Sequence, residues 1–144
     1  MTEVAFHFNA PDRLGYACRL LRKAYLKGAR VLVLVEEGER AALDAALWTR
    51  GAGEFVPHSG PGDPTLVQVR SPIHLACEAS DTHGASVLVN LRAQMPPGHE
   101  RFDRVIEIVT ADEVDRNQAR ERWKRYKMLG FEPQRHDLQL SPQD

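Results

Sequence analysis

The run Arg30–Val35, with the sequence RVLVLV, is the stretch that decides the fold. A continuous apolar run rich in β-branched residues is typical of a central strand that helices cover on both faces, as in a parallel sheet. Before this run, from Arg13 onward, apolar residues recur at spacings of 3, 4 and 7. This spacing predicts a helix with one buried face, which ends where Gly28 can take the left-handed conformation.

Further strands and helices are predicted on either side of these elements. Glu3–Phe8 alternates between apolar and polar residues, which predicts a strand, and Asn9–Asp12 then forms a turn that can cap the first helix. The acidic stretch Glu36–Glu39 is expected to be a solvated turn, and Ala41–Trp48 a second helix. The order strand, helix, strand, helix predicts a three-layer Rossmann-like α/β fold, in which helices flank a mostly parallel central sheet.

The middle of the chain is less regular. Arg50–Pro64 is rich in glycine and proline and predicts a loop, with at most a short strand at Glu54–Pro57. Alternating residues predict three further strands, at Thr65–Arg70, Ser86–Leu91 and Arg104–Val109. With 144 residues in all, we expect a single α/β domain over residues 1–135, followed by a polar tail, 136–144, that frays.

The composition is that of an ordinary globular protein. Hydrophobic residues make up 42% of the chain and charged residues 27%, which excludes the collagen-like and disordered classes. The net charge of −1 argues against a protein that binds nucleic acid through its whole surface, so any recognition of a charged ligand must be local. Two cysteines in no metal-binding pattern, with no long apolar run and no signal segment, predict a cytoplasmic protein that does not enter a membrane.

The sequence lacks the motifs of nucleotide, metal and nucleophilic sites. The turn after the first strand contains no glycine that could admit a pyrophosphate, and Gly51–Gly53 follows a helix rather than a strand. The six histidines are scattered, without the spacing that places two of them on one face. There is no GxSxG motif, and Cys18 lies on the apolar face of its helix. We therefore expect no cofactor, no metal site and no catalysis.

The last helix carries the clearest functional pattern. Thr110–Glu113 matches a capping box at its start, and the helix is expected to run to about Met128, with Gly130 closing it. Two neighbouring stripes follow the helical period. The basic stripe contains Arg116, Arg120, Lys124 and Lys127, and the other contains Ala119, Trp123 and Tyr126. Like charges at this spacing repel one another, so stability alone would not select the basic stripe.

Two interpretations of this helix remain open. It could be an ordinary solvated face whose cations lie near the negative end of the helix. It could instead be a cradle in which arginine and lysine bind carboxylates and the aromatic stripe binds an apolar side chain. Single-stranded nucleic acid is the competing ligand, although the neutral net charge weakens that option. In the same way, Trp48 and Phe55–Pro57 either close the core or form a protein interface.

Several segments, spread over almost the whole chain and in the same order, resemble the chi subunit family of bacterial DNA polymerase III, an accessory of the clamp-loader complex. They are Gly28-x-Arg30-Val31-Leu32, Leu43-Asp44-x-Ala46-Leu47-Trp48, Phe55-Val56-Pro57-His58, Ala119-Arg120-Glu121-Arg122-Trp123-Lys124 with Tyr126, and Gly130-Phe131. The resemblance implies a sheet of the nucleotide-binding type without the nucleotide, in a non-catalytic adapter that is a monomer on its own. The alternatives are a direct binder of single-stranded nucleic acid and a degenerate nucleotide-fold enzyme.

The resemblance also implies partners and sites. The family holds the acidic carboxyl-terminal tail of single-stranded DNA-binding protein, which ends in aspartates, a proline and a phenylalanine, and so meets DNA only indirectly. The tail-binding positions of the family fall on Arg116, Arg120, Lys124, Trp123, Val109 and Gly130, with Trp123 standing where a tyrosine is more usual. Trp48, Phe55 and Pro57 correspond to the contact with the psi subunit, or with another clamp-loader subunit.

Overall fold

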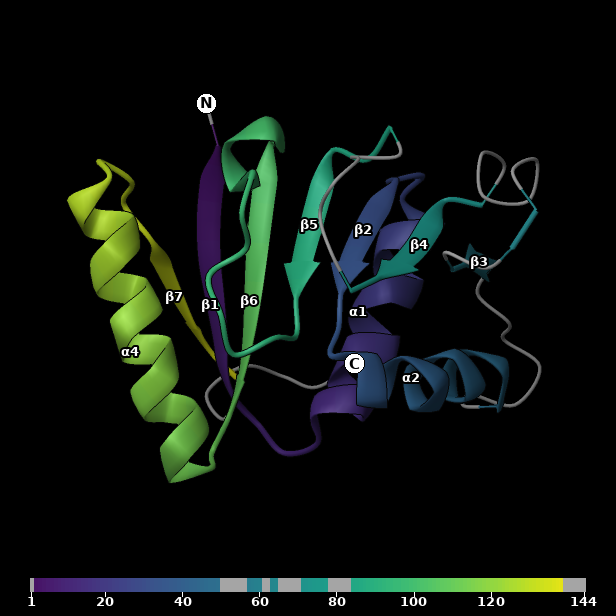
Figure 1. Ribbon diagram of the computed structural model, residues 1–144, viewed down its shortest axis with the longest axis horizontal. Coiled ribbons are helices and arrows are strands. Elements are labelled where there is room, and N and C mark those ends of the chain that lie inside the picture. Colours follow the sequence, from purple (N-terminus) through teal and green to yellow (C-terminus); the bar gives the residue numbers. More distant parts are fainter. Residues whose placement is uncertain (1, 50–56, 61–62, 65–70, 78–83, 139–144) are drawn as a thin grey trace.

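The computed structural model describes residues 2–49, 57–60, 63–64, 71–77 and 84–138. In this part of the chain seven strands form one sheet in the order β3-β4-β2-β5-β6-β1-β7, and every neighbouring pair runs parallel (Figure 1). The strands are β1 (Glu3–Ala10), β2 (Val31–Leu34), β3 (His58–Ser59), β4 (Ile73–Ala76), β5 (Val87–Asn90), β6 (Arg104–Thr110) and β7 (Gln134–Asp137). The helices are α1 (Arg13–Leu26), α2 (Glu37–Thr49), the short 3-10 helix η1 (His99–Arg101) and α4 (Glu113–Met128).

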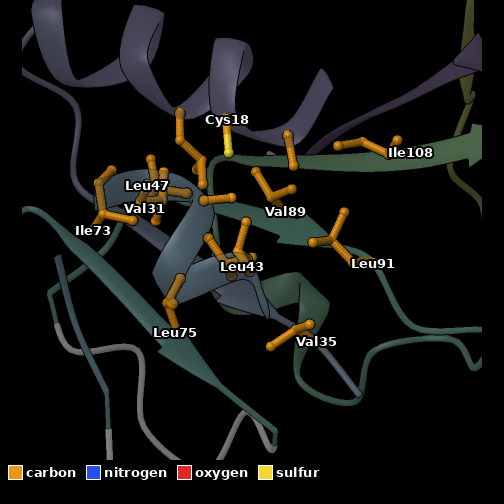
Figure 2. Close-up of a cluster of buried hydrophobic side chains, with 14 of the residues drawn as sticks. Cys18, Val31, Val35, Leu43, Leu47, Ile73, Leu75, Val89, Leu91 and Ile108 are labelled. Carbon is orange, nitrogen blue, oxygen red and sulfur yellow. The ribbon is translucent and has the colours of Figure 1, made fainter. Parts of the chain in front are cut away.

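Different helices cover the two faces of the sheet. α1 and α2 pack on one face, where Cys18, Leu43 and Leu47 meet apolar residues of the strands (Figure 2). α4 packs on the opposite face, and its residues Ala119 and Tyr126 belong to a second apolar cluster. Figure 1 places α4 beside β7 and β1, at the end of the sheet opposite to β3 and β4. The predicted three-layer α/β fold is confirmed.

The run RVLVLV forms the central strand that the sequence predicts. β2 lies between β4 and β5, and all four of its residues are buried. Val31 and Val33 belong to the cluster beneath α1 and α2, whereas Leu32 and Leu34 belong to the cluster that contains α4. Because both faces are covered, the strand is continuously apolar instead of alternating.

Three predicted boundaries are wrong. Asn9 and Ala10, expected in a turn, are the last residues of β1, and Asp12 occupies the N-cap of α1 without a side-chain capping hydrogen bond. The stretch Glu36–Glu39 is not a turn, because α2 begins at Glu37 and its first turn contains two glutamates. Carboxylates are stabilised there by the positive end of the helix dipole. The capping box at Thr110–Glu113 is also wrong. Thr110 stays in β6, and the side chain of Asp112 caps α4 by accepting a hydrogen bond from the backbone N–H of Asp115 at 3.0 Å.

Thr110 instead helps to join three elements through Asp115. The backbone N–H and the hydroxyl of Thr110 donate to Asp115 Oδ2 at 2.7 and 2.9 Å, and Arg13 Nη2 lies 2.8 Å from the same oxygen. Burial alone would raise the pKa of Asp115, but these donors together hold it below its usual value. The end of β6 and the starts of α1 and α4 are thereby tied to one carboxylate.

β4 and β7 are strands that the sequence does not predict. β7 has the polar sequence QRHD because it is the edge strand and its residues are mostly exposed. Its parallel pairing with β1 and the buried side chain of Leu138 hold it in place. His136 and Asp137, expected in the frayed tail, therefore belong to the sheet.

Other predicted elements fall partly or wholly outside the described residues. The predicted strand Thr65–Arg70 and residues 54–56 of the short strand at Glu54–Pro57 are among them, as are residues 139–144 of the predicted tail. β3, at His58–Ser59, lies in the stretch Arg50–Pro64 outside the short strand expected there, so the loop prediction is wrong at these two residues. The predicted strands Ser86–Leu91 and Arg104–Val109 correspond to β5 and β6.

The environment of His7 in β1 makes the stability of the fold depend on pH. His7 Nδ1 lies 2.6 Å from the Tyr16 hydroxyl, and the His7 ring centroid lies 4.8 Å from that of His136. Burial, followed by repulsion from His136 and Arg104, lowers the pKa of His7 from 6.5 to about 4. Between these two pH values the unfolded chain binds a proton that the folded chain does not. Stability therefore falls as the pH falls through this window, by about 3 kcal/mol in all.

We expect His7→Phe to flatten this part of the profile of unfolding free energy against pH, measured by urea denaturation between about pH 7 and about pH 4. The variant also loses the contact of His7 with Tyr16 at every pH, so the informative quantity is the slope and not the absolute stability. Parallel profiles for the wild type and the variant would contradict this role of His7.

Candidate functional site

α4 is held against the sheet by a buried network around Glu107, which lies on β6 and is 0% exposed. Arg122 Nε donates to Glu107 Oε1 at 3.0 Å, and the Tyr126 hydroxyl donates to Glu107 Oε2 at 2.9 Å. Asn90 Nδ2, on β5, donates to Glu107 Oε1 at 2.9 Å. A buried charge is tolerated only when it is paired and hydrogen-bonded, so this network fixes which face of α4 turns toward the sheet.

Burial and the contacts within the network shift the pKa values of its members. Burial raises the pKa of Glu107, and the Arg122 guanidinium and the hydrogen bonds from Tyr126 and Asn90 oppose that rise. Burial and the adjacent Glu107 carboxylate raise the pKa of Tyr126, so its hydroxyl keeps its proton and donates a hydrogen bond. Arg122 is one of the basic residues of this helix and Tyr126 one of its aromatic residues, but both are buried and stabilise the fold.

A surface cavity of about 350 Å³ lies between α4 and the edge of the sheet. It brings together four of the residues that the sequence predicts for a binding site, namely Val109, Arg116, Arg120 and Trp123. Four further residues complete its lining: Phe6, Phe8, Ala119 and Arg135. They come from α4, β6, β1 and β7, so the cavity is formed by segments from both ends of the chain.

Aromatic side chains form the apolar part of the cavity. The ring centroids of Phe6 and Trp123 are 5.2 Å apart, with an interplanar angle of 61°. Phe6 also packs edge to face on Tyr126, at 5.9 Å and 81°. This geometry is favourable for aromatic pairs, and it fixes the half-buried indole of Trp123 at the cavity wall. The side chain is therefore available to a ligand.

The cations that line the cavity have neutral or aromatic contacts in the part of the chain that the structure describes. Arg120 Nη1 donates to the neutral Asn117 Oδ1 at 2.8 Å, and the guanidinium carbon of Arg135 lies 5.0 Å from the centre of the Phe8 ring. Among the described residues, neither these two arginines nor Arg116 forms an ion pair with a carboxylate. Three guanidinium groups therefore line the cavity without a carboxylate partner in the described part of the chain.

Two predicted site residues lie outside this lining. Lys124 Nζ is 3.5 Å from Glu121 Oε1, and both side chains are exposed. Gly130 lines a separate cavity of about 630 Å³, together with Phe131, Glu132 and residues at the start of β1. Lys124 thus flanks the cation-lined cavity, and Gly130 lies beyond the end of α4 with a positive φ of 96°.

Phe6, Phe8 and Arg135 are site residues that the sequence does not predict. The alternation in Glu3–Phe8 places both phenylalanines on one face of a strand, but nothing in it pairs that face with the last helix. Arg135 comes at the end of the predicted domain, where no pattern marks a strand. Only the parallel pairing of β7 with β1 brings it to the cavity.

The structure describes the predicted partner interface only in part. Trp48 lies in the last turn of α2, Phe55 is outside the described residues, and the half-buried Pro57 directly precedes β3.

Two polar pairs connect β3 with neighbouring elements. His58 Nε2 lies 2.7 Å from Asp44 Oδ1, and the Ser59 hydroxyl lies 2.9 Å from Nδ1 of the buried His74. The described residues contain no group of three or more histidine, cysteine or acidic side chains that could hold a metal ion. Within the same ranges, every helix is too short or too polar to span a membrane.

The fold and the site together define a parallel α/β protein with a cationic, aromatic-lined cavity at one edge of its sheet. The family model described as DNA polymerase III chi subunit, HolC, matches residues 1–134. The chain belongs to this family, which is named after a subunit of DNA polymerase III.

Individual relatives agree with this assignment. A protein of Pseudomonas aeruginosa named DNA polymerase III subunit chi is 31% identical over 143 residues, which cover 96% of this chain and 98% of the relative. Proteins of the same name from Haemophilus influenzae and Escherichia coli are 32% identical over 117 residues and 31% identical over 119 residues. These matches cover 80% and 79% of this chain, and 80% and 78% of the relatives.

The buried network predicts a large difference between two arginines of α4. Arg122→Ala leaves Glu107 buried without its ion-pair partner and is expected to lower the unfolding free energy by about 3–5 kcal/mol. Arg125→Ala, on the exposed side of the same helix, is the matched control and is expected to change it by less than about 0.5 kcal/mol. Urea denaturation followed by circular dichroism measures both. Equal losses in the two variants would show that the network does not anchor α4.

Proposed function

We propose that this chi-family protein is a non-catalytic replication adapter whose cation-lined cavity holds the acidic carboxyl-terminal tail of single-stranded DNA-binding protein. The observation that carries the proposal is the set of three arginines, without carboxylate partners among the described residues, around an aromatic cavity. Carboxylates of the tail would pair with Arg116 and Arg120, and its terminal phenylalanine ring would pack on Trp123 and Val109. The chain would thus meet DNA only through its partner.

The energetics favour a reversible interaction. Exposed ion pairs contribute about 0.2–1 kcal/mol each, and burial of a phenylalanine ring about 1.5–3 kcal/mol. With two or three ion pairs the sum is about 2–6 kcal/mol, which corresponds to a Kd of tens of micromolar or weaker. Binding is expected to weaken as salt is added. Lys124 is part of this proposal as a flanking cation, with a smaller effect than Arg120 because Glu121 lies beside it.

A second contact would connect the adapter to the clamp loader. We assign Trp48, Phe55 and Pro57 to this contact, with the psi subunit or another clamp-loader subunit as the partner. Its location supports the assignment, because α2, which carries Trp48, packs on the face of the sheet opposite to α4 (Figure 1). Two partners on opposite faces would not compete for one surface.

The tail-binding proposal is tested with a synthetic peptide that ends in aspartates, a proline and a phenylalanine. Isothermal titration is expected to give a Kd of tens of micromolar or weaker for the wild type and a Kd several-fold higher for Arg120→Ala. Removal of the terminal phenylalanine is expected to cost more affinity than replacement of one aspartate by asparagine, because ring burial exceeds one exposed ion pair. Arg125→Ala, outside the cavity, serves as the control and is expected to leave the Kd unchanged.

Two results would contradict the proposal. In one, the peptide does not bind, or it binds to Arg120→Ala as tightly as to the wild type. In the other, single-stranded DNA alone binds as tightly as the peptide, which would favour direct recognition of nucleic acid instead.

A further inference from the structure

Arg135 differs from the other cations of the cavity because it comes from the edge strand β7 and not from α4. In the parallel ladder it is the residue opposite Phe6 of β1, the phenylalanine that packs on Trp123. Its own guanidinium lies over Phe8, with 5.0 Å between the guanidinium carbon and the ring centre. The cavity therefore has a second cationic wall, which faces the arginines of α4 across the aromatic residues.

The backbone that carries Arg135 is fixed by several contacts. β7 pairs with β1 along its whole length, and the N–H of Leu138, directly after the strand, donates to the Phe8 carbonyl at 3.0 Å. Asn9 Nδ2 donates to Asp137 Oδ1 at 3.0 Å, which joins the ends of the two strands by their side chains. The neighbour His136 packs on His7, so successive residues of β7 are held from different sides. Arg135 is thus presented by an ordered edge strand.

We propose that Arg135, stacked on Phe8, binds a carboxylate of the acidic peptide, so that the peptide is gripped between α4 and β7. This inference rests on the proposed function and adds to it a residue and a strand. A guanidinium is planar, weakly hydrated and suited to bidentate contact with a carboxylate. Contact with Phe8 shields one of its faces and limits its freedom, so less entropy is lost when it binds an acid.

The choice of a carboxylate follows from the surroundings of Arg135. Its guanidinium has no carboxylate partner among the described residues, and phenylalanine side chains lie beside it in the cavity. A guanidinium beside apolar side chains can bind a ligand that carries a carboxylate close to an apolar side chain. The end of the proposed tail has this chemistry. Lys124 and Arg125, which are exposed cations of α4, lack such a wall because they lie outside the cavity.

The test compares Arg135→Gln with Arg125→Gln, a matched loss of one exposed arginine outside the cavity. Titration with the acidic peptide is expected to show a Kd about three-fold to ten-fold higher for Arg135→Gln and less than about two-fold higher for Arg125→Gln. Arg135→Lys keeps the charge but loses the planar group, so its Kd is expected to lie between those of the wild type and Arg135→Gln. Thermal unfolding of each variant checks that the sheet edge is intact.

A second peptide, in which asparagines replace the aspartates and an amide replaces the terminal carboxylate, isolates the proposed contact. The difference between the wild type and Arg135→Gln is expected to shrink to less than about two-fold with this peptide, because the carboxylate that Arg135 binds is gone. A merely structural role of Arg135 would leave the difference unchanged. That result would overturn the inference.

The outcomes separate this inference from the proposed function. If Arg120→Ala weakens binding of the acidic peptide but Arg135→Gln does not, β7 has no part in recognition and the inference fails alone. If the wild type does not bind the peptide, or if neither substitution changes the Kd, the proposed function fails and the inference fails with it.

Discussion

The buried carboxylate of Glu107 is the constraint on which the position of α4 and of the cavity beside it depends. It lies in the middle of a parallel sheet, where it must be matched by donors from α4 and β5, and Arg122, Tyr126 and Asn90 supply them. Arg122 and Tyr126 point inward. Because of the helical period, Arg116 and the cavity-lining residues in the next two turns of α4 then lie on the side of the helix that faces the sheet edge. The position of the cavity is therefore a consequence of how one internal charge is satisfied.

This arrangement divides the basic residues of one helix between the buried network and the lining of the cavity. Arg122 is 3% exposed and paired, whereas Arg116 and Arg120 line the cavity without carboxylate partners in the described part of the chain. The cations of this helix would repel one another less if acidic residues lay between them in the basic stripe. The electrostatic cost is small per pair, and a ligand with several carboxylates would remove it. The same surface would thus be slightly unfavourable alone and favourable in a complex.

Much of the fold was predictable from the sequence, since continuous apolar runs and helical spacing report burial directly. The RVLVLV strand and the last helix are examples. The strand β7 was not predictable, because an edge strand needs no apolar residues and QRHD carries no alternation. For the site, helical spacing was enough to place Arg116, Arg120 and Trp123 together. Arg135 could not be added, because its place depends on pairing between the two ends of the chain.

The most direct test of the central claim is a map of backbone and indole N–H resonances of the isotope-labelled protein during titration with the acidic peptide. We expect the shifts to concentrate on the cavity side of α4, on the indole of Trp123 and on the adjacent parts of β1 and β7. Shifts confined to α1, α2 or the carboxyl ends of β2 and β4 would place the ligand on another surface and contradict the account.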